Sequence, residues 1–182
     1  TFPDVQLPVG ADPETATDID FDGGVHVLPP GVYKTLTIKN GARVSFSPGN
    51  YVVKELVVNN NAILEFNDTT PCNIFATGKV EMEKYNIVNT SRDPKNFRIL
   101  ADEPGSPPVN VKEGSTGYYV VYAPESTVLV DNGSTIYGVV VGKEITVKNS
   151  SNIYYDPNSS SALDMGGGPT AAGLQKVSHQ NF

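Results

Sequence analysis

Two consecutive stretches decide the fold: GVYKTLTIKNGARVSF at residues 31–46 and GNYVVKELVVNNNAILEF at residues 49–66. The apolar residues of the first stretch recur twenty positions later in the second, so that Val44 is matched by Leu64. In each stretch a corner containing Asn or Gly separates short apolar segments. A repeat of this length indicates a solenoid, because each copy is too short to bury an apolar face by itself and must stack on its neighbours.

The second half of the chain repeats in the same way. YVVYAPESTVLVDNGSTIY at residues 119–137 is followed by GVVVGKEITVKNSSNIYY at residues 138–155. Matched residues are nineteen positions apart at first and seventeen apart after a two-residue contraction at a turn, so that Tyr137 is matched by Tyr154. Each of these periods holds three short strands, which favours a triangular coil.

These repeats predict an all-β fold, namely a single-stranded, parallel, right-handed β-helix, or β-solenoid. We expect an irregular lead-in over residues 1–17, the solenoid domain over residues 18–157, and a Ser/Gly-rich segment with a capping tail over residues 158–182. An antiparallel sandwich or jelly roll is the alternative, since it also has short strands and Gly/Asn turns. It gives no reason for side chains to recur at a fixed offset, so we prefer the solenoid.

Stacked coils place equivalent residues of successive periods in columns. One predicted column ends its strands with a small residue at a tight corner and contains Thr77, Ala101, Ala123 and Gly142. A second column, one residue out of step, should point outward and contains Ala76, Leu100, Tyr122 and Val141. An outward apolar row is either covered by the lead-in or the tail, or it forms a partner surface. We expect it to be covered.

Composition excludes some classes of protein. The net charge is −7 and the 13 basic residues are scattered, so the chain lacks the clustered Lys and Arg that bind nucleic acid. No apolar run is long enough to span a membrane, and the sequence shows no signal peptide. Cys72 is the only cysteine, and its apolar neighbours predict a buried side chain rather than a reactive thiol.

The motif DIDFDGG at residues 18–24 is a candidate calcium site. Its D-x-D-x-D-G spacing presents Asp18, Asp20 and Asp22 as a calcium-binding loop would. However, Pro29 stands where the bidentate Glu of an EF-hand would follow. The alternative is simple strand alternation, in which these carboxylates face solvent while the apolar residues between them face the core. No other cofactor is indicated.

The sequence offers little for catalysis. It contains no HExxH or CxxC motif and no spacing that suggests a Ser-His-Asp group, so no catalytic residue is assigned. His26 lies in an alternating strand and is expected to be a strand-face residue. Glu81 and Glu83, beside Lys84, are the nearest match to the acidic clusters of polysaccharide lyases, but such a mixture usually marks a solvated face. We expect the protein not to be an enzyme.

Tyrosine is the more informative residue type. The chain has nine Tyr and no Trp, and six of the nine lie between residues 118 and 155. Tyr137 and Tyr154 occupy equivalent places in successive coils and should stack as a ladder. Together with Tyr122 in the outward column they are the candidate ligand-binding residues, because tyrosine faces stack on sugar rings and on protein partners.

Residues 23–66 resemble a family of bacterial surface proteins. Their pattern, LPPG-x-Y followed by L-x-I, V-x-F-x-PG-x-Y, L-x-V and A-x-L-x-F, is similar to the C-terminal β-helical region of PilX-type and Tad-type pilus-assembly proteins. STIYGVVVGKEITVKNSSNIYYDP at residues 134–157 resembles the closing coil of that region, with Gly142 where the family often has Ala. The resemblance covers about residues 23–157.

The resemblance implies a cell-surface or pilus-linked domain without assigned catalytic residues. We therefore expect a non-catalytic extracellular structural or adhesive module, with pilus or cell-surface proteins or a polysaccharide as its partners. The alternative is a carbohydrate-active enzyme, a lyase or hydrolase, or a carbohydrate-binding module on the same scaffold. A charged cleft on one sheet would favour the enzyme, whereas flat faces bearing Tyr would favour adhesion.

Overall fold

The computed structural model describes residues 4–101, 109–157 and 159. Their secondary structure is all-β, with two short 3-10 helices, η1 (Pro13–Thr15) and η2 (Pro94–Asn96), and no α-helix among the described residues. The strands of the first four coils are β1 (Ile19–Asp22), β2 (Val25–Leu28), β3 (Gly31–Lys39), β4 (Arg43–Phe46), β5 (Gly49–Val58), β6 (Ala62–Phe66), β7 (Cys72–Ala76), β8 (Val80–Glu83) and β9 (Tyr85–Asn89). The remaining strands are β10 (Phe97–Ala101), β11 (Val109–Lys112), β12 (Thr116–Val130), β13 (Thr135–Val147) and β14 (Asn152–Tyr155).

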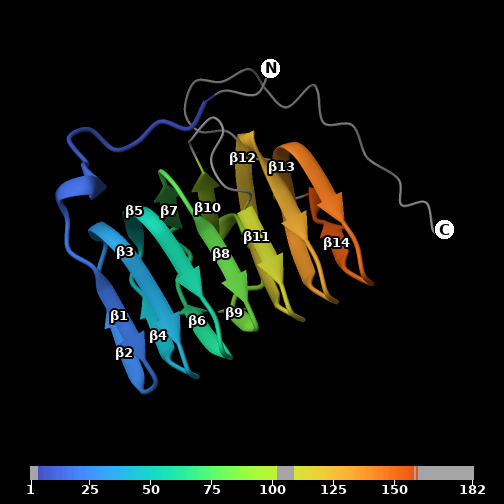
Figure 1. Cartoon of the computed structure of the whole chain (residues 1–182), viewed down its shortest axis with the longest axis horizontal. Coiled ribbons are helices and arrows are strands. Elements are labelled where there is room, and N and C mark those ends of the chain that lie inside the picture. The colour runs from blue at the N-terminus through green and yellow to red at the C-terminus, as the bar shows by residue number, and fades with distance from the viewer. Residues whose placement is uncertain (1–3, 102–108, 158, 160–182) are drawn as a thin grey trace.

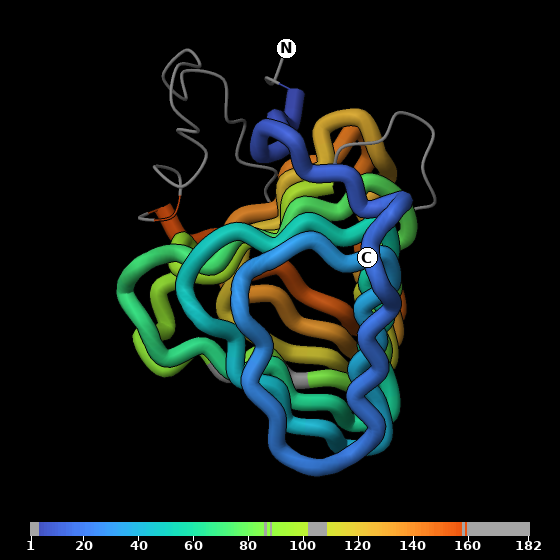
Figure 2. The backbone as a smooth tube through the Cα atoms, turned by 90° about the vertical axis from the view of Figure 1, so that its left-hand side faces the viewer, coloured from blue at the N-terminus to red at the C-terminus, as the bar shows by residue number. Residues whose placement is uncertain are grey.

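The strands wind into a parallel β-solenoid of about six turns, with successive coils side by side along the long axis (Figure 1). Every strand pair is parallel. Viewed from its N-terminal end, the chain runs clockwise as it recedes, so the solenoid is right-handed (Figure 2). The predicted fold is confirmed, and the antiparallel sandwich is excluded.

Each coil has three faces, because the longer strands bend from one face to the next. The first face contains β1, β8, β11 and the C-terminal parts of β3, β5, β12 and β13. The second face contains β2, β4, β6, β9, β14 and the N-terminal parts of β12 and β13. The third face contains β7, β10, the N-terminal parts of β3 and β5 and the middle of β12 and β13.

The register of neighbouring strands follows the sequence repeats. Val44 pairs with Leu64, twenty positions on. Between β12 and β13 the pairing shifts after Ala123, which is the two-residue contraction seen in the sequence. Beyond that shift Tyr137 pairs with Tyr154 as predicted. A fixed offset in the sequence is therefore the stacking of one coil directly on the next.

Two predicted columns need one correction each, and both errors lie in β7. Ala101 pairs with Ala76 rather than Thr77, and Leu100 pairs with Phe75 rather than Ala76. The outward apolar column is thus formed by Phe75, not Ala76, and the small-residue column by Ala76, not Thr77. The physical reason is burial: the interior accepts the small Ala76 at the corner, while the larger Phe75 ring lies on the outside of the third face.

The corner between the first and second faces is a stack of tight turns. At most coils two successive residues there have positive φ, a backbone conformation that Asn and Gly adopt more readily than other residues. The pairs with this geometry are Gly23-Gly24, Asn40-Gly41, Asn60-Asn61, Glu113-Gly114, Asn132-Gly133 and Asn149-Ser150. The Asn/Gly corners of the sequence are therefore the turns that return the chain from one face to the next.

The interior of the coils is apolar, and its tyrosines have hydrogen-bonded tips. The Tyr51 hydroxyl donates to the carbonyl oxygens of Leu28 (2.8 Å) and Ser47 (2.7 Å), so its polar atom is satisfied although the residue is fully buried. Cys72 is buried as predicted, and burial raises the pKa of its thiol. The fold thus holds Cys72 as a small core residue.

The lead-in crosses the outside of the third face (Figure 2). Val5, with Leu7 and Ala11 partly buried beside it, packs on the outward apolar column in a cluster separate from the main core. An ion pair of 2.7 Å between Glu14 and Lys54 lies beside this segment. The expectation that the outward column is covered is confirmed. No described helix is long and apolar enough to cross a bilayer.

The predicted Ser/Gly-rich segment and capping tail, residues 158–182, lie outside the described residues except for Ser159.

Candidate binding surface

Three tyrosines form a continuous stack on the outside of the second face. The ring centroids of Tyr118 and Tyr137 are 4.7 Å apart with an interplanar angle of 16°, and those of Tyr137 and Tyr154 are 5.1 Å apart at 13°. The three come from equivalent positions of β12, β13 and β14. We call this set the tyrosine column. The predicted ladder of Tyr137 and Tyr154 is confirmed.

Sequence reasoning missed Tyr118 as the first ring of the tyrosine column. Its signal was present, since Tyr118 precedes Tyr137 by the nineteen-residue offset of this half. The stack arises because alternate residues of a strand point to the same side and coils are spaced at the distance that parallel aromatic rings prefer. The rings are therefore held in place by the backbone register as well as by each other.

Arg92 extends the tyrosine column at its inner end. Its guanidinium carbon lies 5.9 Å from the centroid of the Tyr118 ring, within the range of a cation–π contact. Arg92 has a positive φ in the loop before η2, and its backbone N–H donates to the backbone carbonyl of Asn89 at 3.0 Å. The side-chain amide of Asn89 in turn donates to the backbone carbonyl of Tyr118 at 3.3 Å. The loop is thus fixed to the strand that carries the first ring.

Stacking decides what the tyrosine column can bind. The faces of Tyr118 and Tyr137 lie against neighbouring groups, so their edges are what remains for a ligand. Tyr154 ends the stack, is 53% exposed, and has no further ring on its outer side among the described residues. A sugar ring needs an open aromatic face to stack on, and only Tyr154 offers one within the column.

Tyr122, the third tyrosine predicted to bind a ligand, lies elsewhere. It is on the outside of the third face, pairs with Leu100 and Val141, and is 1% exposed under the lead-in. Burial raises the pKa of its hydroxyl. As long as Val5 and its neighbours stay in place, Tyr122 is a packing residue and not part of an accessible surface.

The structure does not bring Asp18, Asp20 and Asp22 together around one point. The Asp18 carboxylate accepts from the backbone N–H of Thr35 at 3.1 Å, and Asp20 accepts from Lys39 at 2.7 Å. The Asp20 and Asp22 carboxylates raise the pKa of the Lys39 ammonium, with the hydrogen bond to Asp20 as the largest cause. No described group of three His, Cys, Asp or Glu could hold a metal ion. The motif therefore follows its alternative interpretation, in which the residues of one strand point alternately toward the core and toward solvent.

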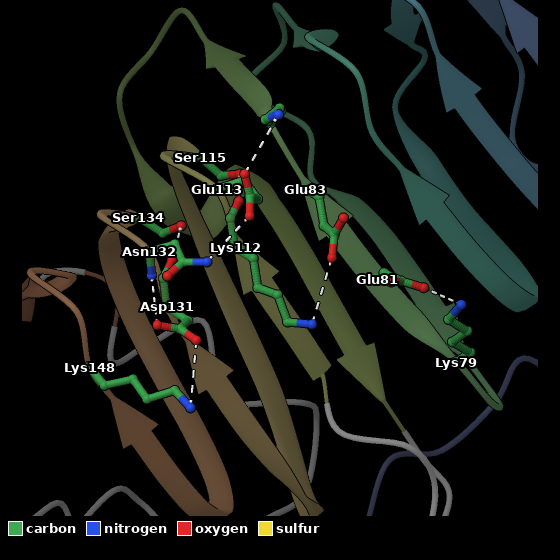
Figure 3. Close-up of polar contacts among 11 residues, drawn as sticks. Lys79, Glu81, Glu83, Lys112, Glu113, Ser115, Asp131, Asn132, Ser134 and Lys148 are labelled. Atoms are coloured by element: carbon green, nitrogen blue, oxygen red, sulfur yellow. Dashed lines mark hydrogen bonds and ion pairs between the residues drawn. The ribbon is translucent and has the colours of Figure 1, made fainter.

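A second column, of charged residues interrupted by one uncharged rung at Asn59, runs along the edge of the first face. We call it the charge column; it contains Asp22, Lys39, Asn59, Glu83, Lys112, Asp131 and Lys148. The nitrogen–oxygen distances of its pairs are 3.7 Å for Lys39–Asp22, 3.6 Å for Lys112–Glu83 and 3.6 Å for Lys148–Asp131. Figure 3 shows the C-terminal part of the column, where these side chains reach from coil to coil. Each charge is thus matched within the chain.

Asp131 is the most enclosed member of the charge column, with its side chain 11% exposed. Burial opposes its ionisation, but the N–H of Asn132, the amide of Asn149 (2.7 Å) and the charge of Lys148 together lower the pKa of its carboxyl. Asp131 therefore stays ionised and ties the corners of the last coils together.

The acidic residues considered for catalysis are engaged in the same way. Glu81 forms an ion pair with Lys79 and Glu83 with Lys112, both on the outside of the first face. His26 points toward the interior of the first coil, where its ring lies 4.6 Å from that of Phe21 and its Nε2 contacts the Gly23 carbonyl at 2.6 Å. These groups are separated over different faces rather than gathered in one site.

Fold and surface define a class of protein: a right-handed parallel β-solenoid with a covered third face and a tyrosine column on the second. The chain belongs to the family described as a domain of unknown function, DUF7305, whose model matches residues 10–161. No curated protein and no solved structure matches the chain. The family description assigns no ligand and no activity.

Proposed function

We propose that this domain is a non-catalytic structural and adhesive module of the bacterial cell surface, and that the tyrosine column is its binding surface. The observation that carries the proposal is the regular stack of Tyr118, Tyr137 and Tyr154 on the outside of the second face. Tyrosine is enriched at interfaces because it supplies a large contact area at a low cost in conformational entropy.

The scaffold supports this role by fixing the rings before a partner arrives. The strands that carry the tyrosine column are paired with each other over most of their length, and the rings restrict one another by stacking. A surface that is already ordered loses little side-chain freedom on binding, so more of the contact energy appears as affinity. A stiff column of this kind suits a module that holds a partner rather than one that transforms a substrate.

The geometry favours a protein partner over a polysaccharide. Stacking occupies the faces of two of the three rings, and ring faces are what sugars need. Ring edges, together with the neighbouring outward residues Thr116, Thr135 and Asn152, suit the side chains and backbone of a protein. The resemblance of residues 23–157 to pilus-assembly proteins supports a pilus or cell-surface protein as that partner.

Binding to surface protein preparations tests the proposal. Intact pili and outer-surface protein extracts of the source bacterium would be titrated against the purified domain, alongside a polysaccharide panel. We expect the Y118A/Y137A/Y154A variant to lose binding at least tenfold, as expected when anchoring aromatic residues are removed. Tyr155→Ala is the matched control, because Tyr155 is 49% exposed on the same strand as Tyr154 and, as the next residue, points to the opposite side of that strand.

Three results would contradict the proposal. Unchanged binding by the triple variant would remove the tyrosine column from the interface. Binding to a polysaccharide with no binding to protein would overturn the assigned partner. Turnover of any polysaccharide in the panel, abolished by Glu81→Gln or Glu83→Gln, would favour the carbohydrate-active enzyme instead. Surface labelling of intact cells would test the extracellular location directly.

A further inference from the structure

Both ends of the solenoid present unpaired parallel strands. At the N-terminal end β1 pairs only with β3, and β2 only with β4, among the described residues. At the C-terminal end β14 and the last part of β13 likewise have a described neighbour on one side alone. A strand edge without a paired neighbour is a template for pairing with another chain.

The C-terminal coil also leaves interior positions exposed. Ile145 and Val147 pair with Val128 and Val130, which are fully buried, yet they are themselves 42% and 39% exposed. Tyr155, one coil beyond the buried Gly138, is 49% exposed. These side chains occupy core columns that no further coil continues among the described residues. Another coil placed against this end would bury them.

The N-terminal coil has the complementary features. Val27 is 69% exposed and occupies the first rung of the same outward column that Tyr154 ends. Ile19 and Phe21, on β1, are the first rungs of the core columns that Ile145 and Val147 end. They are only partly buried against the core. The two ends therefore carry matching apolar rows in the same order.

We propose that copies of this domain stack head to tail, with β13 and β14 of one copy pairing in parallel with β1 and β2 of the next. Continuing the register of successive coils places Ile145 beside Ile19, Val147 beside Phe21 and Tyr154 beside Val27 of the second copy. The column edges of Tyr118 and Tyr137 stay free in such a stack. Of the tyrosine column only Tyr154 takes part in the junction, so partner binding through Tyr118 and Tyr137 and self-association through Tyr154 can be measured separately.

Charge complementarity favours this direction of assembly. The same register places Lys148 of one copy beside Asp22 of the next, which continues the alternation of the charge column across the junction. Stacking two N-terminal ends would instead bring the carboxylates of two β1 strands together. One junction contact is unfavourable, since Glu144 would lie beside Asp18, and both are exposed.

A head-to-tail interface uses two different surfaces and does not close by itself. Copies joined through a small rotation per junction form open filaments rather than dimers. The assembly would extend all three faces of the solenoid, so that each added copy repeats the tyrosine column along one side. Its length should rise with protein concentration.

Disulfide trapping tests the junction in the full chain. Val27→Cys and Tyr154→Cys variants are prepared separately and mixed under mild oxidation; Cys72 is buried and serves as an internal negative control. We expect the mixture to form a 27–154 linked product at least about tenfold faster than either variant alone forms a like-with-like product. No linked product, or equal rates for 27–27, 154–154 and 27–154, would overturn the proposal.

Charge variants give an independent readout by analytical ultracentrifugation. Glu144→Lys should tighten self-association about two- to fivefold and Lys148→Glu should weaken it by a similar factor, both less so at high salt. A full chain that remains monomeric while a chain ending at Ser159 associates would overturn the proposal for the intact protein. A monomer in every variant would do the same.

Discussion

The charge column and the tyrosine column are built by the same repeat, but they differ in whether every charge or ring face has a partner within the column. In the charge column three pairs of a Lys with an Asp or Glu join neighbouring rungs, so the charges are matched within the chain. In the tyrosine column each ring is matched by the next, and the last ring, Tyr154, keeps one open side. The charges of the charge column are therefore paired with one another, whereas in the tyrosine column the outer face of Tyr154 has no stacking ring among the described residues.

The largest expected effect comes from the glycine that lets the tyrosine column form. Gly138 follows Tyr137, and an added Cβ would lie 2.1 Å from the Tyr119 carbonyl oxygen and 3.0 Å from Pro94. Gly138→Ala should therefore force β13 away from β12 and lower the free energy of unfolding by roughly 2–4 kcal/mol. Urea unfolding followed by tyrosine near-UV circular dichroism measures both stability and stacking.

Thr135→Ala is the control for that substitution, because Thr135 lies outward on the same strand. It should change stability by less than about 0.5 kcal/mol. Equal stability of Gly138→Ala and the unmodified protein would show that β13 has room to move, and the close approach at Gly138 would then not explain the order of the column.

Next in size is the difference between the middle and the last ring. Tyr137 stacks on two rings and Tyr154 on one, and each aromatic pair contributes about 0.5–1.5 kcal/mol beyond area burial. Tyr137→Ala should therefore cost about 1–3 kcal/mol, and Tyr154→Ala about half as much. Because the chain has no Trp, tyrosine fluorescence reports the loss of stacking directly. Equal costs for both variants would mean that the rings do not support one another.

The repeats allowed the fold and part of the tyrosine column to be predicted from sequence. Where a strand copies its neighbour closely, as at Tyr137 and Tyr154, the offset alone gave the correct contact. The prediction failed by one residue at β7, where residues 67–71 form a loop that breaks the period before Cys72. A short strand after an irregular loop has no offset to fix its register, and burial decides it instead.

Other surface contacts could not be predicted from the repeat, because they involve segments outside it. Arg92 reaches Tyr118 from a loop outside the repeat, and its position depends on the hydrogen bonds of Asn89. The sequence predicted that the outward column with Tyr122 is covered, but not which residues of the lead-in cover it, because the lead-in has no repeat of its own. Contacts between an irregular segment and a regular one are set by tertiary packing, which a pattern in either segment does not encode.

Acid should weaken the charge column and leave the tyrosine column intact. The pKa of Asp131 is lower in the folded chain than its ordinary value of 3.8, so this carboxylate stabilises the fold at neutral pH. That contribution is lost as the pH falls through 3.8 toward the folded-state pKa. The stability of Asp131→Asn should consequently depend less on pH between about 5 and 3 than that of the unmodified protein. Identical slopes would contradict the assignment.

The smallest expected effect concerns the exposed pairs of the charge column. Lys112 and Glu83 are 3.6 Å apart with side chains 27% and 34% exposed, so water competes with their attraction. Lys112→Ala should reduce the free energy of unfolding by no more than about 1 kcal/mol, and salt near about 1 M should remove most of that difference. The cost of Tyr137→Ala should persist in the same salt, because ring stacking is not screened. If salt instead reduced both costs equally, the two columns would owe their stability to the same force, and the distinction between an ion-paired column and a stacked column would lose its physical basis.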